Sequence, residues 1–252
     1  MPRMTLLVRI ALAWAICSLM VPANPQMVGV FEPDINVPYG ACAHPDGKHI
    51  IISGKPGYGY ISGGIAIYNL ETEESQLLTH EQLVPNQSIL SMLPLKNGDI
   101  LCGTGIYGGH GAGAVEEEAF LAILDWKTKQ ISFKVTPFPA ASEVWHMCWG
   151  PDDRVYAIVN GGTLVVFDPE SGEVVATKKI EGVGSAAKEN AIALAHDGNL
   201  YALFHNAIVR ITPGTLEIEK VADAPGFINA GIAIVGERLY FGLGSHLWSM
   251  KL

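Results

Sequence analysis

The stretch GPDDRVYAIVNGGTLVVFDPESGEVV, residues 150–175, decides the fold of this chain. A turn at Asp152-Asp153 precedes the apolar run VYAIV (155–159), and a second apolar run, TLVVF (163–167), follows after three small polar residues. A polar turn and an alternating segment complete the stretch. Turns of the Asp and Asn type tolerate the left-handed backbone of a tight hairpin. The pattern therefore predicts successive antiparallel strands joined by short connections.

The same unit of hairpin turn and apolar strands recurs along the chain. A third strand follows each hairpin, and a fourth strand follows most of them. Units of four strands that repeat about every 40–50 residues are typical of β-propellers, whose blades cover one another's faces. The sequence thus predicts an all-β propeller of four-stranded antiparallel blades, about five in number. The hairpin turns that mark the units are Asp46-Gly47, Asn97-Gly98, Asp152-Asp153, Asp197-Gly198 and Gly236-Glu237.

The last predicted blade lacks its outer strand. Residues 27–33, MVGVFEP, have the pattern of an outer strand, but no inner strands of the same blade precede them in the sequence. Either these residues complete the last blade and close a five-bladed ring, or the chain is an arc of a larger propeller. The arc is slightly favoured, because residues 1–26 do not resemble blade sequence. The predicted blades span roughly 34–87, 88–140, 141–184, 185–226 and 227–252.

Residues 1–26 are interpreted as a signal peptide or as a non-native N-terminal segment. They contain an apolar run of about fourteen residues, which suits a signal peptide and is shorter than the roughly twenty residues of a membrane span. Val21 and Ala23 are small residues at the positions before a cleavage point. We therefore expect an extracytoplasmic or secreted protein without a stable membrane span. A cytoplasmic location is the alternative.

Charge and cysteine content argue against several classes of partner. The net charge of -9 and the absence of a basic run disfavour nucleic acid, which needs clustered Lys and Arg. The cysteines are Cys17, Cys42, Cys102 and Cys148, with no CxxC pair. This spacing predicts buried thiols rather than a metal site, and no cofactor is expected. The oligomeric state is left open, as a monomer or an unknown oligomer.

Residues 150–175 resemble the YVTN/NHL/PQQ-like family of propeller repeats, in which an Asp-type hairpin precedes an apolar strand and a D-x-x-[ST]-G turn. The resemblance covers residues 27–252 in a general way and implies the fold. It implies function weakly, because such propellers serve as sensors, scaffolds, lyases and lactonases. Quinoprotein blades often carry a tryptophan after this turn, whereas this chain has Glu173-Val174-Val175. The resemblance therefore does not extend to a bound quinone.

In a propeller, the loops from second to third strand share one face with the loops between blades, and ligand sites usually lie there. The longest such loop is GTGIYGGHGAGAVEEEA, residues 103–119. A phosphate cradle is disfavoured, because the following segment reads as a strand rather than a helix. The residues expected on this face are Lys55, Tyr58, Tyr60, Tyr107, His110, Glu116, Glu117, Glu118, Glu143, Asn160, Lys188, Asn190, His205, Asn229 and His246.

Three interpretations of residues 103–119 remain open. One is a mobile surface loop with solvated side chains, which is the favoured alternative. Another is a metal site that pairs His110 with a histidine or glutamate of another blade. The third is acid–base chemistry by the candidate catalytic residues His110, Tyr107 and Lys55.

The function expected from the sequence is a non-catalytic binding or scaffold propeller. Exposed tyrosines beside glycines suit contact with carbohydrate or protein. The alternative is a carbohydrate-active propeller enzyme resembling a polysaccharide lyase. Away from this face, His44, His49 and His80 are expected at the surface, and His146 in the core. The tryptophans are expected to pack within blades. The predicted ligand-binding residues are Tyr58, Tyr60, Tyr107, His110, His205 and His246.

Overall fold

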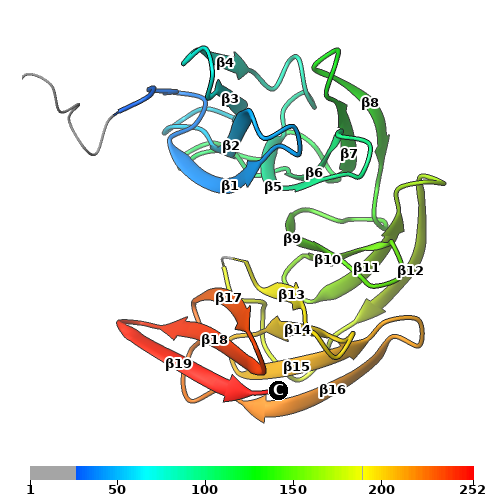
Figure 1. Cartoon of the computed structure of the whole chain (residues 1–252). Coiled ribbons are helices and arrows are strands. Elements are labelled where there is room, and N and C mark those ends of the chain that lie inside the picture. The colour runs from blue at the N-terminus through cyan, green and yellow to red at the C-terminus, as the bar shows by residue number, and fades with distance from the viewer. Residues whose placement is uncertain (1–26, 189) are drawn as a thin grey trace, which may run out of the picture. The chain divides into compact units, whose positions relative to one another are not determined.

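The computed structural model describes residues 27–188 and 190–252, and every regular element in these ranges is a β-strand (Figure 1). The predicted signal peptide and Cys17 lie outside the described residues. Residues Phe31–Leu252 form one compact unit. None of the described residues forms a helix long and apolar enough to cross a membrane.

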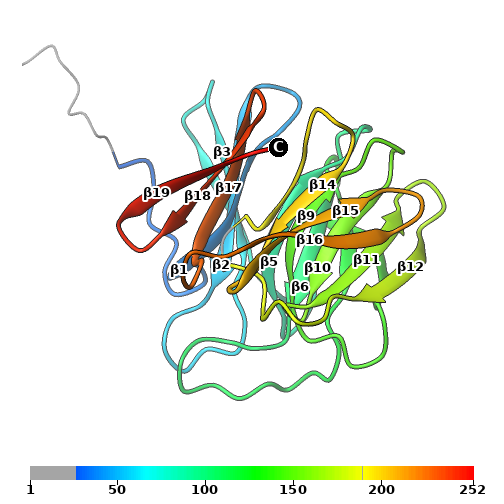
Figure 2. The ribbon, with the colours of Figure 1, turned by 90° about the horizontal axis from the view of Figure 1, so that it is seen from below.

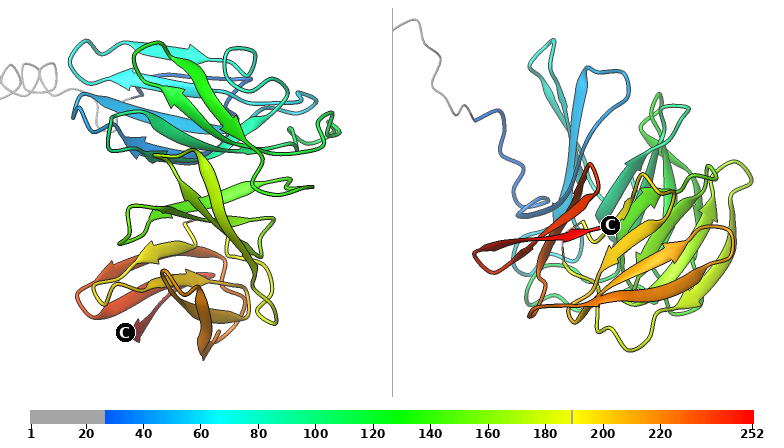
Figure 3. Two further views of the ribbon diagram at one scale, coloured as in Figure 1. Left: turned by 90° about the vertical axis from the view of Figure 1, so that its right-hand side faces the viewer. Right: turned by 60° about the horizontal axis from the view of Figure 1, so that its bottom comes forward.

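The strands form five antiparallel sheets, each contiguous in sequence, which are the blades of a five-bladed β-propeller. Figures 1 and 3 show the blades following one another in chain order. The first blade contains β1 (Val37–Ala43), β2 (His49–Lys55), β3 (Ile65–Asn69) and β4 (Ser75–Leu78). The second contains β5 (Ser88–Pro94), β6 (Ile100–Gly105), β7 (Leu121–Asp125) and β8 (Gln130–Val135).

The remaining blades repeat this order of strands. The third contains β9 (Val144–Trp149), β10 (Val155–Val159), β11 (Thr163–Asp168) and β12 (Glu173–Lys179). The fourth contains β13 (Ile192–Leu194), β14 (Leu200–Leu203), β15 (Ala207–Thr212) and β16 (Glu217–Asp223). The fifth has three strands, β17 (Ala230–Val235), β18 (Arg238–Leu243) and β19 (His246–Lys251). The predicted all-β propeller fold is therefore confirmed.

The predicted hairpin turns form where local chemistry favours them. Asp153 takes a φ of 62°, and Gly98 and Gly198 take φ values of 93° and 80°. A second local device recurs in two blades. The hydroxyl of Tyr156 donates to Asp152 at 3.0 Å, and the hydroxyl of Tyr201 donates to Asp197 at the same distance. The aspartate of the turn is thus tied to the strand that follows it.

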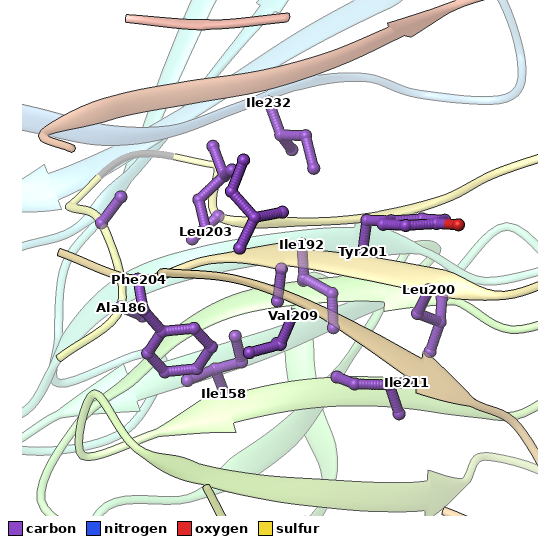
Figure 4. Close-up of a cluster of buried hydrophobic side chains, with 14 of the residues drawn as sticks. Ile158, Ala186, Ile192, Leu200, Tyr201, Leu203, Phe204, Val209, Ile211 and Ile232 are labelled. Atoms are coloured by element: carbon purple, nitrogen blue, oxygen red, sulfur yellow. The ribbon is translucent and has the colours of Figure 1, made fainter. Parts of the chain in front are cut away.

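Apolar side chains fill the spaces between neighbouring blades. One cluster joins the first two blades around Ile51 and Ile100, and another joins the second and third around Leu101 and Phe167. The largest cluster joins the third, fourth and fifth blades and includes Phe204 and Ile232 (Figure 4). Each blade therefore gains its stability from burial against its neighbours rather than alone.

The fifth blade differs from the others at its outer edge. It has three strands, and residues Met27–Phe31 form no strand. Strand packing joins successive blades from β1 and β2 against β5 through to β13 and β14 against β17. Completion of the fifth blade by residues 27–33 stays a prediction.

Candidate functional site

Two glycine-rich loops lie side by side at the face predicted to carry the site (Figure 2). They are residues 56–64, between β2 and β3, and residues 106–120, between β6 and β7. The backbone N–H of Gly59 donates to the His110 carbonyl at 2.9 Å, and that of Gly109 donates to the Tyr60 carbonyl at 3.0 Å. A Cβ on Gly109 would lie 2.0 Å from the Gly57 carbonyl oxygen. The glycines therefore let two backbones meet.

The acidic end of the second loop is tied to neighbouring segments. The Asn86 amide donates to the Glu116 carboxylate at 2.8 Å. The backbone N–H of Ala140 donates to the Glu118 carboxylate at 3.0 Å, and the Gln87 amide donates to the Glu118 carbonyl at 2.8 Å. Both carboxylates thus hold the loop against the connections between blades. Glu117 is exposed.

A cavity of about 450 Å³ opens between these loops and the start of β1. Tyr58 and His110 stand on its rim, and both are exposed. The Tyr58 ring lies against Gly111, where a Cβ would come within 2.8 Å of the ring. Polar, aromatic and backbone groups share its wall. The lining consists of Asn36, Val37, Tyr39, Lys55, Pro56, Tyr58 and residues 108–112.

The inner wall of this cavity is an ion pair among aromatic rings. Lys55 Nζ lies 3.0 Å from Glu143 Oε1, and the two side chains are 15% and 19% exposed. The same ammonium lies 5.4 Å from the Trp145 ring centroid, 5.9 Å from that of Tyr107 and 6.0 Å from that of Tyr39. Rings at this range attract a cation through their electron-rich faces. Lys55 is therefore held by charge and by three rings.

A second cavity, of about 240 Å³, lies on the other side of this wall. Lys55 and Tyr39 line the first cavity, whereas Glu143 and Trp145 line the second. The Tyr39 and Trp145 rings meet edge to face at 4.9 Å and 84°. The wall between the cavities is thus one ion pair and one aromatic pair. The rest of the second lining is His146, Asn160, Gly161, His205 and residues 185–188.

Asn160 fixes the position of Glu143. Its side-chain oxygen accepts from the backbone N–H groups of Ser142 and Glu143 at 2.7 and 3.1 Å. Its own backbone N–H donates to the Glu143 carbonyl at 2.9 Å. Asn160 takes a φ of 49°, which asparagine tolerates better than most residues. The residue therefore shapes the loop that presents the carboxylate.

His205 lies in the second cavity on an aromatic support. Its ring stacks on Phe227 with centroids 3.9 Å apart. Among the described residues, its Nε2 is buried without a hydrogen-bond partner. Burial, followed by the charge of Lys188, lowers the pKa of His205. The His205 side chain thus offers an unsatisfied polar atom in the cavity wall.

His146 is the buried histidine that the sequence predicted for the core. Its Nδ1 accepts the backbone N–H of Ala191 at 3.4 Å. Burial lowers its pKa to about 4, so the ring is neutral at physiological pH. The side chain also forms part of the second cavity's floor, where it contributes a neutral polar surface.

The structure brings only some of the predicted site residues together. Lys55, Tyr58 and His110 line the first cavity, and His205 lines the second. Tyr107 contributes its ring to Lys55. Tyr60 and His246 are exposed and line neither of the two cavities. In the described part of the chain, the side chains of His110 and Tyr107 make no hydrogen bond.

Sequence reasoning missed two members of this site and misplaced a histidine elsewhere. Tyr39 was not considered, and Trp145 was assigned to blade packing, yet both form the wall between the cavities. Both residues lie near the beginning of an inner strand, next to the loop face, and this position could have indicated that they belong to the site. His44 is not the surface residue expected, because it is 5% exposed and stacks on Trp126 at 3.8 Å.

Comparisons with known proteins support the fold. No protein-family model matches, and neither does any curated protein. Among solved structures, the RRP9 WD40 repeats share 12% identity, with 91% of this chain and 64% of that chain covered and a TM-score of 0.65. The extracellular domain of BT4673 from B. thetaiotaomicron shares 16% identity at a TM-score of 0.63, with 89% of this chain covered.

A gluconolactonase from Xanthomonas campestris is also similar, with 12% identity, 85% of this chain and 71% of that chain covered, and a TM-score of 0.58. The chain spans 28% of the BT4673 structure and just under two thirds of the RRP9 structure. These neighbours are propeller proteins of binding and enzymatic kinds. At such identities the likeness shows the fold alone, so the YVTN/NHL/PQQ-like assignment stays a prediction.

Proposed function

We propose that this chain is a binding propeller that takes a neutral oligosaccharide across the two cavities of the loop face. The observation that carries the proposal is the shared wall, in which Lys55 pairs with Glu143 and Tyr39 meets Trp145. Binding sites for small ligands combine apolar and aromatic surface with a few placed polar groups. Two adjoining hollows with aromatic walls suit a chain of sugar rings.

The balance of charge favours a neutral sugar. The Lys55 ammonium is already neutralised by Glu143 at 3.0 Å, and the His205 pKa is lowered, which favours a neutral ring. Asn36 and Asn160 add neutral polar groups. At the shared wall a uronate would lack an unpaired cation, because Lys55 is paired with Glu143. The exposed Lys188 belongs to the lining of the second cavity, so an acidic sugar held there is the outcome that the glycan array distinguishes from a neutral one.

The same contacts count against a polysaccharide-lyase-like activity, which is the alternative function. Abstraction of a proton beside a carboxylate needs a base and a positive charge at the same carbon. Lys55 is engaged by Glu143, and among the residues that the structure describes the His110 side chain has no hydrogen bond that would orient it as a base. Incubation with uronate polymers, followed at the absorbance of unsaturated products, tests this alternative. Product formation that His110→Ala abolishes would establish the enzyme.

Glycan-array screening followed by calorimetric titration tests the binding proposal. Tyr58→Ala and Trp145→Ala remove one aromatic wall from each cavity, and each is expected to weaken binding about tenfold or more. Tyr240→Ala, in the fifth blade outside both linings, is the matched control. Absence of any glycan ligand, or equal losses in all three variants, would refute the proposal. A protein captured through Tyr58 and Tyr60 instead would identify a protein ligand.

An extracytoplasmic location belongs to this proposal. One structural neighbour is itself an extracellular domain. Secretion of the full chain with loss of residues 1–23, measured by mass spectrometry of the mature protein, is the expected result. An intact N-terminus on protein recovered from the cytoplasm would contradict it.

A further inference from the structure

The hairpin turn between β1 and β2 gathers three metal-ligating side chains. Asp46 Oδ2 lies 2.9 Å from His44 Nδ1 and 2.8 Å from His49 Nδ1. The three ligand atoms lie within 4.8 Å of one another. Two metal bonds of about 2.1 Å place their ligand atoms about 3 Å apart at a right angle and about 3.4 Å apart at the tetrahedral angle that zinc prefers. The spacing therefore matches neighbouring positions around one divalent ion.

His44 is prepared to act as a ligand. Its Nε2 lies 2.7 Å from the Gly98 carbonyl oxygen, which only accepts, so Nε2 carries the ring proton. The Nδ1 atom of His44 accepts the Asp46 backbone N–H at 3.1 Å, and this bond is exchanged for the metal when an ion binds. Histidine ligands commonly donate their other ring N–H to a carbonyl in this way. Stacking on Trp126, at 3.8 Å and 14°, fixes the ring.

The hydrogen bonds around His49 oppose metal coordination by its Nδ1 atom. The Asn69 amide donates to His49 Nε2 at 3.1 Å. The Asn69 oxygen accepts the backbone N–H groups of Glu71 and Thr72 at 2.8 and 3.1 Å, which fixes the amide orientation. The ring proton of His49 therefore sits on Nδ1. Coordination through Nδ1 moves this proton to Nε2, where it meets the Asn69 N–H and opposes binding.

We propose that His44, Asp46 and His49 form a site for a divalent transition metal ion of the zinc type. Two imidazoles and one carboxylate suit Zn²⁺, Ni²⁺ and Cu²⁺. The Asp46 and His49 side chains are 28% and 22% exposed, so the remaining coordination positions face solvent. A cavity of about 210 Å³ beside His49 gives access. The site lies beyond the opposite end of β1 from Tyr39 and is independent of the proposed sugar site.

Trp126 supplies a direct readout of the proposed site. Its ring contacts the ligand His44, and Lys129 Nζ lies 3.4 Å from its centroid, adding one charge that opposes a cation. Ni²⁺ is expected to quench the fluorescence of Trp126 saturably. Trp126→Phe should lose this quenching while keeping zinc binding at a 1:1 ratio by calorimetry.

The ligands are tested with variants that keep the turn. Asp46→Asn retains the oxygen that accepts the Lys48 backbone N–H at 2.8 Å, and His49→Gln alters a half-buried side chain. Each is expected to weaken zinc binding at least tenfold, with unchanged thermal unfolding of the metal-free chain. Should either variant unfold, the other still decides.

Asn69→Asp is expected to strengthen zinc binding, whereas the ligand variants weaken it, and it tests the hydrogen bond that opposes coordination by His49. One carboxylate oxygen keeps the backbone bonds, and the other accepts the proton of His49 Nε2, so zinc binding should tighten about tenfold. Gln76→Glu adds the same charge to the lining of the same cavity without a contact to His49, and is the control. The proposal is overturned by no saturable zinc binding, by unchanged binding in Asp46→Asn and His49→Gln, or by equal effects of Asn69→Asp and Gln76→Glu.

Discussion

Lys55 Nζ and Glu143 Oε1 lie 3.0 Å apart and join the first blade to the third across the second. The two residues are 88 positions apart in the chain. Their side chains form the wall between two cavities, so the pair couples the packing of three blades to the shape of the site.

Lys55→Met is expected to lower the free energy of unfolding by about 1–3 kcal/mol, because it leaves the Glu143 carboxylate partly buried and unpaired. Urea denaturation measures the loss. Lys55→Met combined with Glu143→Gln should cost less than the sum of the single changes, since neither charge is then stranded. If the losses of unfolding free energy in the two single variants simply added up in the double variant, the ion pair would contribute nothing to stability.

Gly109→Ala is expected to destabilise the protein by about 1–3 kcal/mol, because a Cβ would stand 2.0 Å from the Gly57 carbonyl oxygen. Gly113→Ala in the same loop is the matched control, since no atom lies within 4 Å of its Cβ. Its effect should stay within about 0.5 kcal/mol. Thermal unfolding of both variants checks the difference. Equal stability would mean that the two loops do not pack closely in solution.

His146 makes the stability depend on pH. Its pKa is about 4 in the folded chain against 6.5 in the reference state. Between these values the unfolded chain binds the proton and the folded chain does not, so stability falls as pH drops from 6.5 toward 4. The loss from this group is about 3 kcal/mol. His146→Gln should flatten this part of the profile in urea titrations. An unchanged slope would assign the dependence to other groups.

The cysteines are expected to differ in reactivity according to burial. Cys102 is buried, and burial raises its thiol pKa. Burial raises the pKa of Cys42 to about 11 and that of Cys148 to about 12. Because the thiolate is the reactive form, alkylation at pH 8 should be slow at all three sites and fast in denaturant. Peptide mass spectrometry after timed labelling measures this. Rapid native labelling of Cys102 would contradict the packing described.

The fold followed from the sequence because its determinants are local. Turns such as Asp152-Asp153 and Asn97-Gly98 set hairpins through neighbouring residues, and the apolar runs between them identify strands. The face that carries Lys55, Tyr58 and His110 also followed, since propeller topology assigns loops to faces. The missing outer strand of the fifth blade was apparent as well.

The details of the site did not follow, because they depend on contacts between blades. Nothing near Lys55 in the sequence selects Glu143 as its partner. The sequence predicts Trp145 as a packing residue, and only its contacts with Tyr39 and Lys55 place it in the wall between the cavities. His44 is buried by Trp126 of another blade, which no local pattern indicates. The grouping of His44 with Asp46 and His49 does have a local signal, the pattern H-x-D-x-x-H.

Hydrogen–deuterium exchange with a saturating oligosaccharide tests the central claim most directly. The account predicts slowed exchange in residues 56–64, 106–112, 141–145 and 184–188, which surround the two cavities. The hairpin turns at 45–48, 96–99 and 151–154 should exchange as in the free protein. Protection confined to those turns, or absent from both sets of segments, would contradict a binding site on the loop face.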